Sequence, residues 1–196
     1  MEKGKKKEKM KKETLKLETN KWESFNLSSI FKITQINNKH SSYAFKKGQT
    51  PLVSDIKTNN GVKRYVENTN ENIKPISGNC ITINISGRAF YQPKNFYVES
   101  HKKINVLRPL DSVTFNPYIG LFITTVVNKR FDFGHLCKNE TMLNVLDNAT
   151  IKLPIQYNDN GTPYIDPDKK YSKNGYVPNW EFMEKHIKTI PGAEKI

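Results

Sequence analysis

The stretch TPLVSDIKTNNGVKRYVE, residues 50–67, places two short runs of β-branched and apolar residues on either side of an Asn-Gly dipeptide. Runs of this kind, bounded by turn residues, are typical of strands. Asn60-Gly61 is the best hairpin signal in the sequence, because a type I′ turn needs positive φ at both central positions and Asn-Gly adopts these angles at the least cost. The stretch therefore predicts a β-hairpin that turns at this dipeptide.

More runs of the same kind follow between Lys47 and Val113, each separated from the next by turn residues. They are CITINIS (80–86), GRAF (87–90) and FYVES (96–100). Short strands at close spacing favour hairpin connections over the longer crossovers that parallel strands require. The sequence therefore predicts a largely antiparallel sheet.

One buried helix and one short strand are expected farther along the chain. Residues 116–129 (NPYIGLFITTVVNK) mix a helical start signal with β-branched residues. We predict a helix, because Pro117 would occupy its first position behind the N-cap Asn116. Residues 150–155 (TIKLPI) predict a strand that ends at Pro154.

A polar loop and an amphipathic helix are predicted near the C-terminus. Residues 156–178 are rich in Asn, Asp, Gly, Pro and Tyr, which favour turns. The helix opens at Asn179 and stops at Pro191-Gly192. Its apolar face follows from i, i+3, i+7 spacing and contains Trp180, Met183 and Ile187.

Length and composition indicate one domain and no membrane segment. The chain has 196 residues, which suits a single domain of about 100 to 200 residues. Its longest apolar stretch, residues 118–127, is shorter than the roughly 20 residues of a membrane-spanning helix, and no secretion signal follows the basic start. Cys80 and Cys137 stand far apart with no CxxC pair, so neither a disulfide nor a zinc site is indicated. We expect a cytoplasmic protein with free thiols.

The charge of the chain favours a polyanionic partner. The formal net charge is +13, and the sequence pI is about 9.6. Residues 1–20 alternate Lys and Glu with few apolar side chains, so we expect a poorly ordered basic leader or linker there. The rest of the chain remains basic. Lys and Arg that neutralise phosphates release counterions and so supply affinity that does not depend on sequence.

Catalytic motifs are absent from the sequence. It contains no GK[ST] loop, GxGxxG, GxSxG or HExxH pattern, and no carboxylate cluster suited to Mg²⁺. His135 near Cys137 is the one pair that suggests a nucleophile and a base, and its spacing is generic. We interpret five aspartates as turn residues or caps: Asp55, Asp111, Asp132, Asp166 and Asp168. We predict no catalytic residue, metal site or cofactor in this chain.

Four segments, taken in order, carry a resemblance to a known family. They are WESFNLSSIF (22–31), residues 48–66 with TPLVS and NNGVKRYV, CITINISGRAFYQ (80–92), and residues 151–183 with IKLPI and PNWEFME. This series resembles the target recognition domain of type I restriction-modification specificity subunits and of the related type IIG and IIB restriction enzymes. Together the segments span most of residues 22–185.

The resemblance implies an α+β fold, in which a twisted, largely antiparallel β-sheet recognition domain with a few helices is followed by the start of a conserved C-terminal helix. It divides the chain into the leader (1–20), the target recognition domain (21–178) and the start of the conserved helix (179–196). A complete specificity subunit looks like two such domains alternating with two long helices. The chain therefore resembles a half-subunit, the terminal reader of a fused enzyme, or a fragment.

The resemblance also implies a function and partners. The chain is expected to bind double-stranded DNA in a sequence-specific way and to direct a methyltransferase and an endonuclease to the site. Those activities would reside in partner subunits or covalently fused domains, with S-adenosylmethionine on the methyltransferase. A second specificity half is a further expected partner.

Candidate DNA contacts concentrate in the segment KTNNGVKRY, residues 57–65. Lys and Arg can contact phosphates, Arg can bind guanine through two hydrogen bonds, and Asn can do the same with adenine. The predicted DNA-binding residues are Lys57, Asn59, Asn60, Lys63, Arg64, Tyr65, Arg88, Gln92, Lys94, Asn95, Lys102 and Lys103. Two alternatives stay open. Asn59 and Asn60 could shape the hairpin without contacting DNA, and Lys94 and Asn95 could form an ordinary solvated turn.

Two other function classes fit the same composition. One is a basic RNA-binding or ribosome-associated protein that stacks bases on exposed aromatic side chains. The other is an interaction domain that binds a partner through the helix at residues 180–189. Preference for duplex over single strands would separate the first from a DNA reader, and the oligomeric state after deletion of residues 179–196 would test the second.

Overall fold

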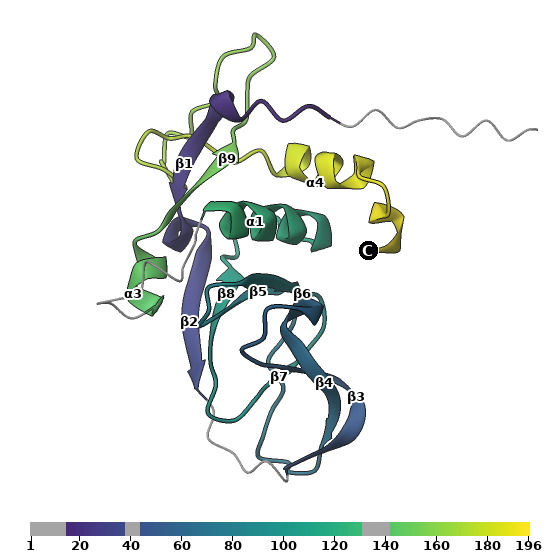
Figure 1. Ribbon diagram of the computed structural model, residues 1–196. Helices are drawn as coiled ribbons and strands as arrows, with labels where there is room; N and C mark the ends of the chain where they lie inside the picture. Colours follow the sequence, from purple (N-terminus) through teal and green to yellow (C-terminus); the bar gives the residue numbers. More distant parts are fainter. Residues whose placement is uncertain (1–14, 38–43, 131–141) are drawn as a thin grey trace, which may run out of the picture.

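Two β-sheets and a two-stranded ribbon form the framework of the protein (Figure 1). The structure is a computed structural model that describes residues 15–37, 44–130 and 142–196. The central sheet has the order β2 (Phe31–Asn37), β8 (Lys103–Pro109), β5 (Cys80–Asn84), β6 (Ala89–Gln92), and all of its pairs are antiparallel. The three-stranded sheet has the order β4 (Val62–Asn68), β3 (Phe45–Val53), β7 (Tyr97–Val98). The ribbon pairs β1 (Trp22–Asn26) with β9 (Thr150–Pro154).

Three α-helices and four short 3₁₀ turns complete the described part of the fold. The α-helices are α1 (Pro117–Arg130), α3 (Met142–Asp147) and α4 (Trp180–Thr189). The 3₁₀ turns are η1 (Thr19–Lys21), η2 (Leu27–Ser29), η4 (Asn59–Gly61) and η5 (Ala193–Lys195). The predicted α+β fold with a largely antiparallel sheet and few helices is confirmed, since only the β3–β7 pair is parallel among the described strands.

Local capping signals set the starts of the two longer helices, as predicted. The Oδ1 atom of Asn116 accepts hydrogen bonds from the backbone N–H groups of Tyr118 (3.0 Å) and Ile119 (3.1 Å). Asn179 caps α4 in the same way by accepting from the N–H of Phe182 at 2.9 Å. An N-cap of this kind satisfies a donor that has no partner within the helix. The strand predicted before Pro154 is also present.

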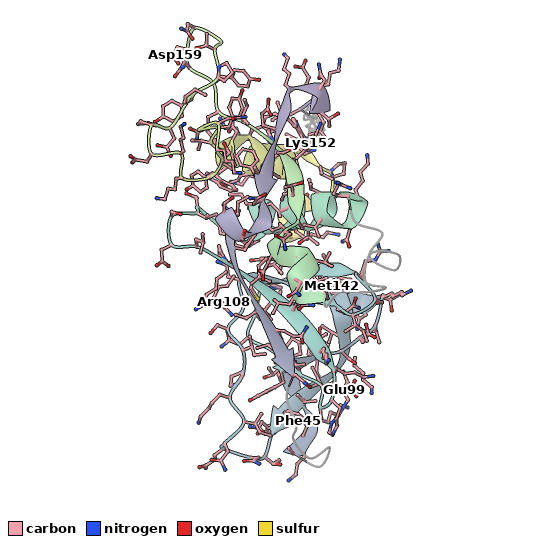
Figure 2. All side chains as sticks on the ribbon, turned by 90° about the vertical axis from the view of Figure 1, so that its left-hand side faces the viewer. Phe45, Glu99, Arg108, Met142, Lys152 and Asp159 are labelled. Carbon is pink, nitrogen blue, oxygen red and sulfur yellow. The ribbon has the colours of Figure 1, made fainter. Side chains whose placement is uncertain are left out.

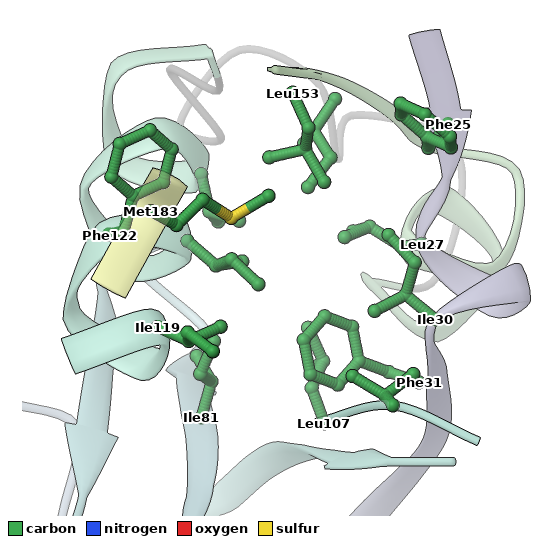
Figure 3. Close-up of a cluster of buried hydrophobic side chains, with 14 of the residues drawn as sticks. Phe25, Leu27, Ile30, Phe31, Ile81, Leu107, Ile119, Phe122, Leu153 and Met183 are labelled. Atoms are coloured by element: carbon green, nitrogen blue, oxygen red, sulfur yellow. The ribbon is translucent and has the colours of Figure 1, made fainter. Parts of the chain in front are cut away.

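The main core lies between the central sheet and the helices (Figure 3). Ile81 and Leu107 point from the sheet toward Ile119 of α1, and Met183 of α4 and Leu153 of β9 extend the same cluster. The predicted apolar face of α4 is confirmed, because its three apolar residues are buried in this cluster. Helix α4 therefore packs into the domain, and its role as the start of a longer conserved helix stays a prediction.

A second core joins the other face of the central sheet to the three-stranded sheet. Cys80 and Val106 of the central sheet pack with Val53, Val62 and Phe96. Successive residues of a strand point to opposite faces, so Cys80 faces this core while its neighbour Ile81 faces α1. Burial raises the pKa of the Cys80 thiol to about 11. The central sheet is therefore the middle layer of the molecule, and this thiol is protonated at neutral pH.

The β3–β4 hairpin differs from the predicted one in its turn. The two strands pair antiparallel, and both Asn60 (φ 53°) and Gly61 (φ 73°) have positive φ, as predicted. The prediction of a two-residue turn is wrong, however, because residues 54–61 form a longer loop. A hydrogen bond from the N–H of Ser54 to the carbonyl oxygen of Gly61 (2.9 Å) closes this loop. The positive φ begins one residue earlier, at Asn59 (φ 49°), and Asn60 and Gly61 end a 3₁₀ turn that leads into β4.

Candidate nucleic-acid interface

Loop 54–61 is fastened to the central sheet by two buried amide side chains. Gln92 is 2% exposed, and its Nε2 donates a hydrogen bond to the carbonyl oxygen of Asn60 (3.0 Å). Asn84, also 2% exposed, donates from Nδ2 to the carbonyl oxygen of Ile56 (2.9 Å). A buried amide left without a partner would cost about 1–3 kcal/mol. These two contacts therefore hold the loop in one backbone conformation.

The two asparagines at the end of the loop use their side-chain amides internally. Asn59 donates from Nδ2 to the carbonyl oxygen of Val62 (2.7 Å), and Asn60 donates to that of Tyr91 (2.9 Å). Both residues are exposed, but each already uses one hydrogen of its N–H₂ group for an internal bond. These bonds support the alternative in which the asparagines shape the connection between the strands.

The turn 85–88 between β5 and β6 lies alongside this loop. The Oδ1 atom of Asp55 accepts a hydrogen bond from the Ser86 hydroxyl (3.2 Å). The Oδ1 atom of Asn84 accepts from the same hydroxyl (2.9 Å) and from the N–H of Arg88 (2.8 Å). Asn84 therefore connects the loop to the turn, and the turn presents Arg88 exposed to solvent.

A carboxylate links the start of β4 to the segment 99–103. Glu99 accepts hydrogen bonds from the Lys63 ammonium, with which it forms an ion pair, and from the Ser54 hydroxyl. Burial alone would raise the pKa of Glu99, but the bonds from Lys63 and Ser54, together with the charges of Lys63 and Lys102, outweigh it and lower the pKa. The Glu99 carboxylate is therefore ionised at neutral pH, and its negative charge offsets part of the positive charge of the loop face at Lys63.

We call the surface formed by loop 54–61, turn 85–88 and segment 99–103 the loop face. It contains Lys57, Asn59, Asn60, Arg88, Lys102 and Lys103 of the predicted DNA-binding residues, and Lys63, Arg64 and Tyr65 adjoin it on β4. Tyr65 is 53% exposed although it is aromatic. The structure thus brings together most of the residues that the sequence suggested, including pairs far apart in the chain such as Lys63 and Lys102.

Three predicted residues lie elsewhere. Gln92 points into the interior, where its amide is satisfied, so it cannot contact a ligand from this position. Lys94 and Asn95 follow β6 at the end opposite turn 85–88, and the Oδ1 atom of Asn95 accepts from the N–H of Gly78 (3.0 Å). Sequence patterns could not distinguish these three residues from those of the loop face, because the burial of a polar residue depends on which loop packs over it.

The half of the molecule that carries the loop face is strongly basic. Residues 44–109, all of them described, include eleven Lys and Arg residues and four Asp and Glu residues. Two of the four acids are engaged, Glu99 with Lys63 and Asp55 with Ser86. An excess of cations at this density attracts polyanions.

Of the residues that the sequence did not single out, Glu99, Ser54 and Ser86 help to build the site, and no sequence signal marks them.

A large groove lies in the other half of the molecule. It measures about 670 Å³ between α1, α4 and the β1–β9 ribbon, with an apolar floor that includes Trp22, Phe122 and Ile151. Lys152 lines this groove, whereas Glu99 lies in the other half of the molecule (Figure 2). The groove is therefore separate from the loop face.

The described residues contain no cluster of side chains that would suit a metal ion. No group of three His, Cys, Asp or Glu side chains that could hold a metal ion occurs there. His135, Cys137 and Asp132 lie outside the described residues. Among the described helices, none has the length and apolar content needed to cross a membrane.

Two solved structures of specificity subunits have a similar fold. One is the HsdS subunit from Thermoanaerobacter tengcongensis, with a TM-score of 0.51 and 11% identity over 92% of this chain and 39% of that one. Another is the type I restriction-modification S subunit from M. genitalium, with a TM-score of 0.55 and 12% identity over 89% of this chain and 39% of that one. The chain thus spans about two fifths of these subunits, and the likeness at this identity shows the fold.

The sequence itself carries the family assignment. No curated protein matches it. The family model for the type I restriction modification DNA specificity domain matches residues 19–190, which include every β-strand and α-helix described above. The chain therefore belongs to the family of type I restriction-modification DNA specificity domains.

Proposed function

We propose that this domain binds double-stranded DNA in a sequence-specific way through the loop face. The observation that carries the proposal is loop 54–61, a basic loop whose backbone is held on the central sheet by the buried amides of Asn84 and Gln92. A loop with one fixed conformation can present side chains to base edges in a fixed register, which sequence discrimination requires. Membership in a specificity-domain family supports the same function.

The residues of the loop face divide into two roles. Lys57, Lys102 and Lys103 suit phosphate contacts, which set orientation without reading sequence. Arg64 and Arg88 suit base contacts, because a guanidinium can bind the N7 and O6 atoms of guanine together. Tyr65, the residue after Arg64 on β4, adds an exposed aromatic ring.

The remaining machinery of restriction and modification would belong to partners. We place the methyltransferase and endonuclease activities on other subunits or fused domains, with S-adenosylmethionine bound by the methyltransferase. A second specificity half would supply the other part of the target site, since this chain spans 39% of the similar subunits. Specificity without catalysis is the role proposed for this chain, in the cytoplasm.

Arg64 provides the sharpest test. Selection from randomised duplexes gives a preferred sequence, and titration then compares that duplex with a random one and with a single-stranded RNA of the same sequence. Arg64→Ala should weaken binding to the preferred duplex by about 1–3 kcal/mol and change binding to random duplex much less. Lys173→Ala, in the exposed part of the 156–178 loop, serves as the control and should leave the preference unchanged.

Two results would contradict the proposal. An equal loss on both duplexes would remove Arg64 as a base-reading residue. Tighter binding to single-stranded RNA than to any selected duplex would favour an RNA-binding function instead.

A further inference from the structure

The tip of turn 85–88 carries an exposed aliphatic side chain. Ile85 is 52% exposed and follows directly after the last residue of β5. Backbone hydrogen bonds close the turn, from the N–H of Gly87 to Asn84 (3.0 Å) and from the N–H of Asn84 to Arg88 (3.2 Å). Gly87 has φ 81°, a value that glycine adopts without strain.

The conformation of this turn does not depend on Ile85. It is fixed by the backbone bonds above and by the side chains of Asn84, Ser86 and Asp55, which bond to one another. A β-branched, apolar residue has no advantage in an exposed turn, since the usual turn residues are Gly, Asn, Asp, Ser and Pro. In residues 44–109, all of them described, Ile85 and Tyr65 are the large hydrophobic residues left exposed. The side chain of Ile85 is therefore available for an apolar contact outside the fold.

The surroundings of Ile85 are polar and cationic. Arg88 lies in the same turn, and Lys57 follows Ile56, which Asn84 holds. Lys103 precedes Ile104, the residue that pairs with Asn84 across the sheet. An isolated apolar tip within a basic surface fits a polyanion that also offers a small apolar group. In the major groove of duplex DNA that group is the C5 methyl of thymine.

We propose that Ile85 contacts a thymine methyl group in the major groove and so selects an A·T pair at one position of the target. The inference rests on the proposed DNA-binding function and adds a specificity-determining residue to it. The cations of the loop face hold the phosphates, and the turn that Asn84 and Ser86 fix presents Ile85 to the base.

The test replaces the methyl group and the isoleucine separately. The full chain is titrated with its selected duplex and with duplexes in which each thymine in turn is replaced by deoxyuridine, which lacks only the C5 methyl. At one thymine, this replacement should weaken binding of the unmodified chain about fourfold, the factor expected from one buried methyl group. Ile85→Ala should bind the thymine and deoxyuridine duplexes at that position equally well.

The controls separate this inference from the function on which it rests. Ile165→Ala removes an isoleucine of similar exposure, 48%, from the loop 156–178, and the thymine dependence should stay intact. If the unmodified chain prefers no duplex, the proposed function fails. If it prefers one and Ile85→Ala loses the same affinity on thymine and deoxyuridine duplexes at every position, DNA reading stands and the methyl contact is wrong.

Discussion

At the scale of single residues, buried amides connect the layers where loop 54–61 crosses the central sheet. Gln92 uses both hydrogens of its amide, one for the Asn60 carbonyl and one for the Thr82 hydroxyl at 3.0 Å. Thr82 lies on β5 and Gln92 on β6, so one side chain ties two strands to the loop. A polar network of this kind adds specificity of conformation as long as every member is satisfied.

Replacing Gln92 by leucine should affect both stability and recognition. Gln92→Leu keeps the size of the side chain but removes both donors, which leaves the Asn60 carbonyl and the Thr82 hydroxyl without this partner. We expect a loss of about 1–3 kcal/mol in the free energy of unfolding, measured by urea denaturation. We also expect a smaller ratio of preferred to random duplex affinity at a temperature where the variant is folded. Gln49→Leu, at an exposed position of β3, is the matched control; equal behaviour of the two variants would contradict this role for Gln92.

The carboxylate of Glu99 predicts a dependence of stability on pH. Its pKa in the folded chain is lowered, because the bonds from Lys63 and Ser54 outweigh the effect of burial. A lowered pKa means that the carboxylate stabilises the fold above its unfolded pKa and that this stabilisation disappears as the pH falls through the folded pKa. Glu99→Gln should therefore lower the melting temperature at pH 7, and the difference from the unmodified chain should shrink in acid. Glu67→Gln, at an exposed position of β4, serves for comparison; a pH-independent difference for Glu99→Gln would refute the assignment.

At the scale of elements, helix α1 covers the β6 edge of the central sheet at Ala89. Asn128 accepts a hydrogen bond from the N–H of Ala89 and donates one to its carbonyl oxygen, both at 2.9 Å. The Asn128 side chain thus makes with β6 the two hydrogen bonds that a residue of a neighbouring strand would make. Gly120, two turns earlier on α1, allows the helix to approach the ring of Tyr91. An edge strand covered in this way cannot pair with another chain at Ala89.

Gly120 is the position where this packing is most sensitive. A Cβ atom added there would lie 2.4 Å from Cδ2 of Tyr91, whose ring is buried and whose hydroxyl donates to Asn79. Gly120→Ala should therefore destabilise the fold by about 1–3 kcal/mol, although alanine favours a helix more than glycine does. Urea denaturation measures this, with Thr125→Ala at an exposed position of α1 as the control. A stabilising effect of Gly120→Ala would show that α1 and β6 do not approach so closely.

Elements with local signals could be predicted from the sequence. Asn116 and Asn179 mark the starts of α1 and α4, because an N-cap bonds to backbone only two or three residues away. Pro154 marks the end of β9 in the same local way. The length of loop 54–61 and the burial of Gln92 could not be predicted, since both follow from contacts between segments about 30 residues apart.

The candidate site was predictable to a similar extent. Lys57, Arg64 and Arg88 could be singled out, because exposed basic residues near turn signals are typical of DNA contacts. Ile85 carried no signal, since an isoleucine after a β-type run reads as a core residue until the turn is seen to expose it. The hydrogen bond between Asp55 and Ser86 carried no sequence signal either.

At the scale of the whole molecule, the two faces of the central sheet have different neighbours. One face packs against α1 in the main core, which also includes residues of α4 and the ribbon. The other face carries the three-stranded sheet and the basic loop face (Figure 1). The apolar groove and the loop face lie in different halves of the molecule (Figure 2). We infer that recognition of DNA involves the basic half, residues 44–109.

The measurement that tests this account most directly is the affinity of the full chain for its selected duplex and for a scrambled duplex of the same length and base composition, at one fixed salt concentration. Phosphate contacts contribute equally to both, so any difference comes from base and shape readout. If the loop face reads bases, the selected duplex should bind at least about 1,000-fold more tightly than the scrambled one. Equal affinities for the two duplexes would contradict base reading by the loop face.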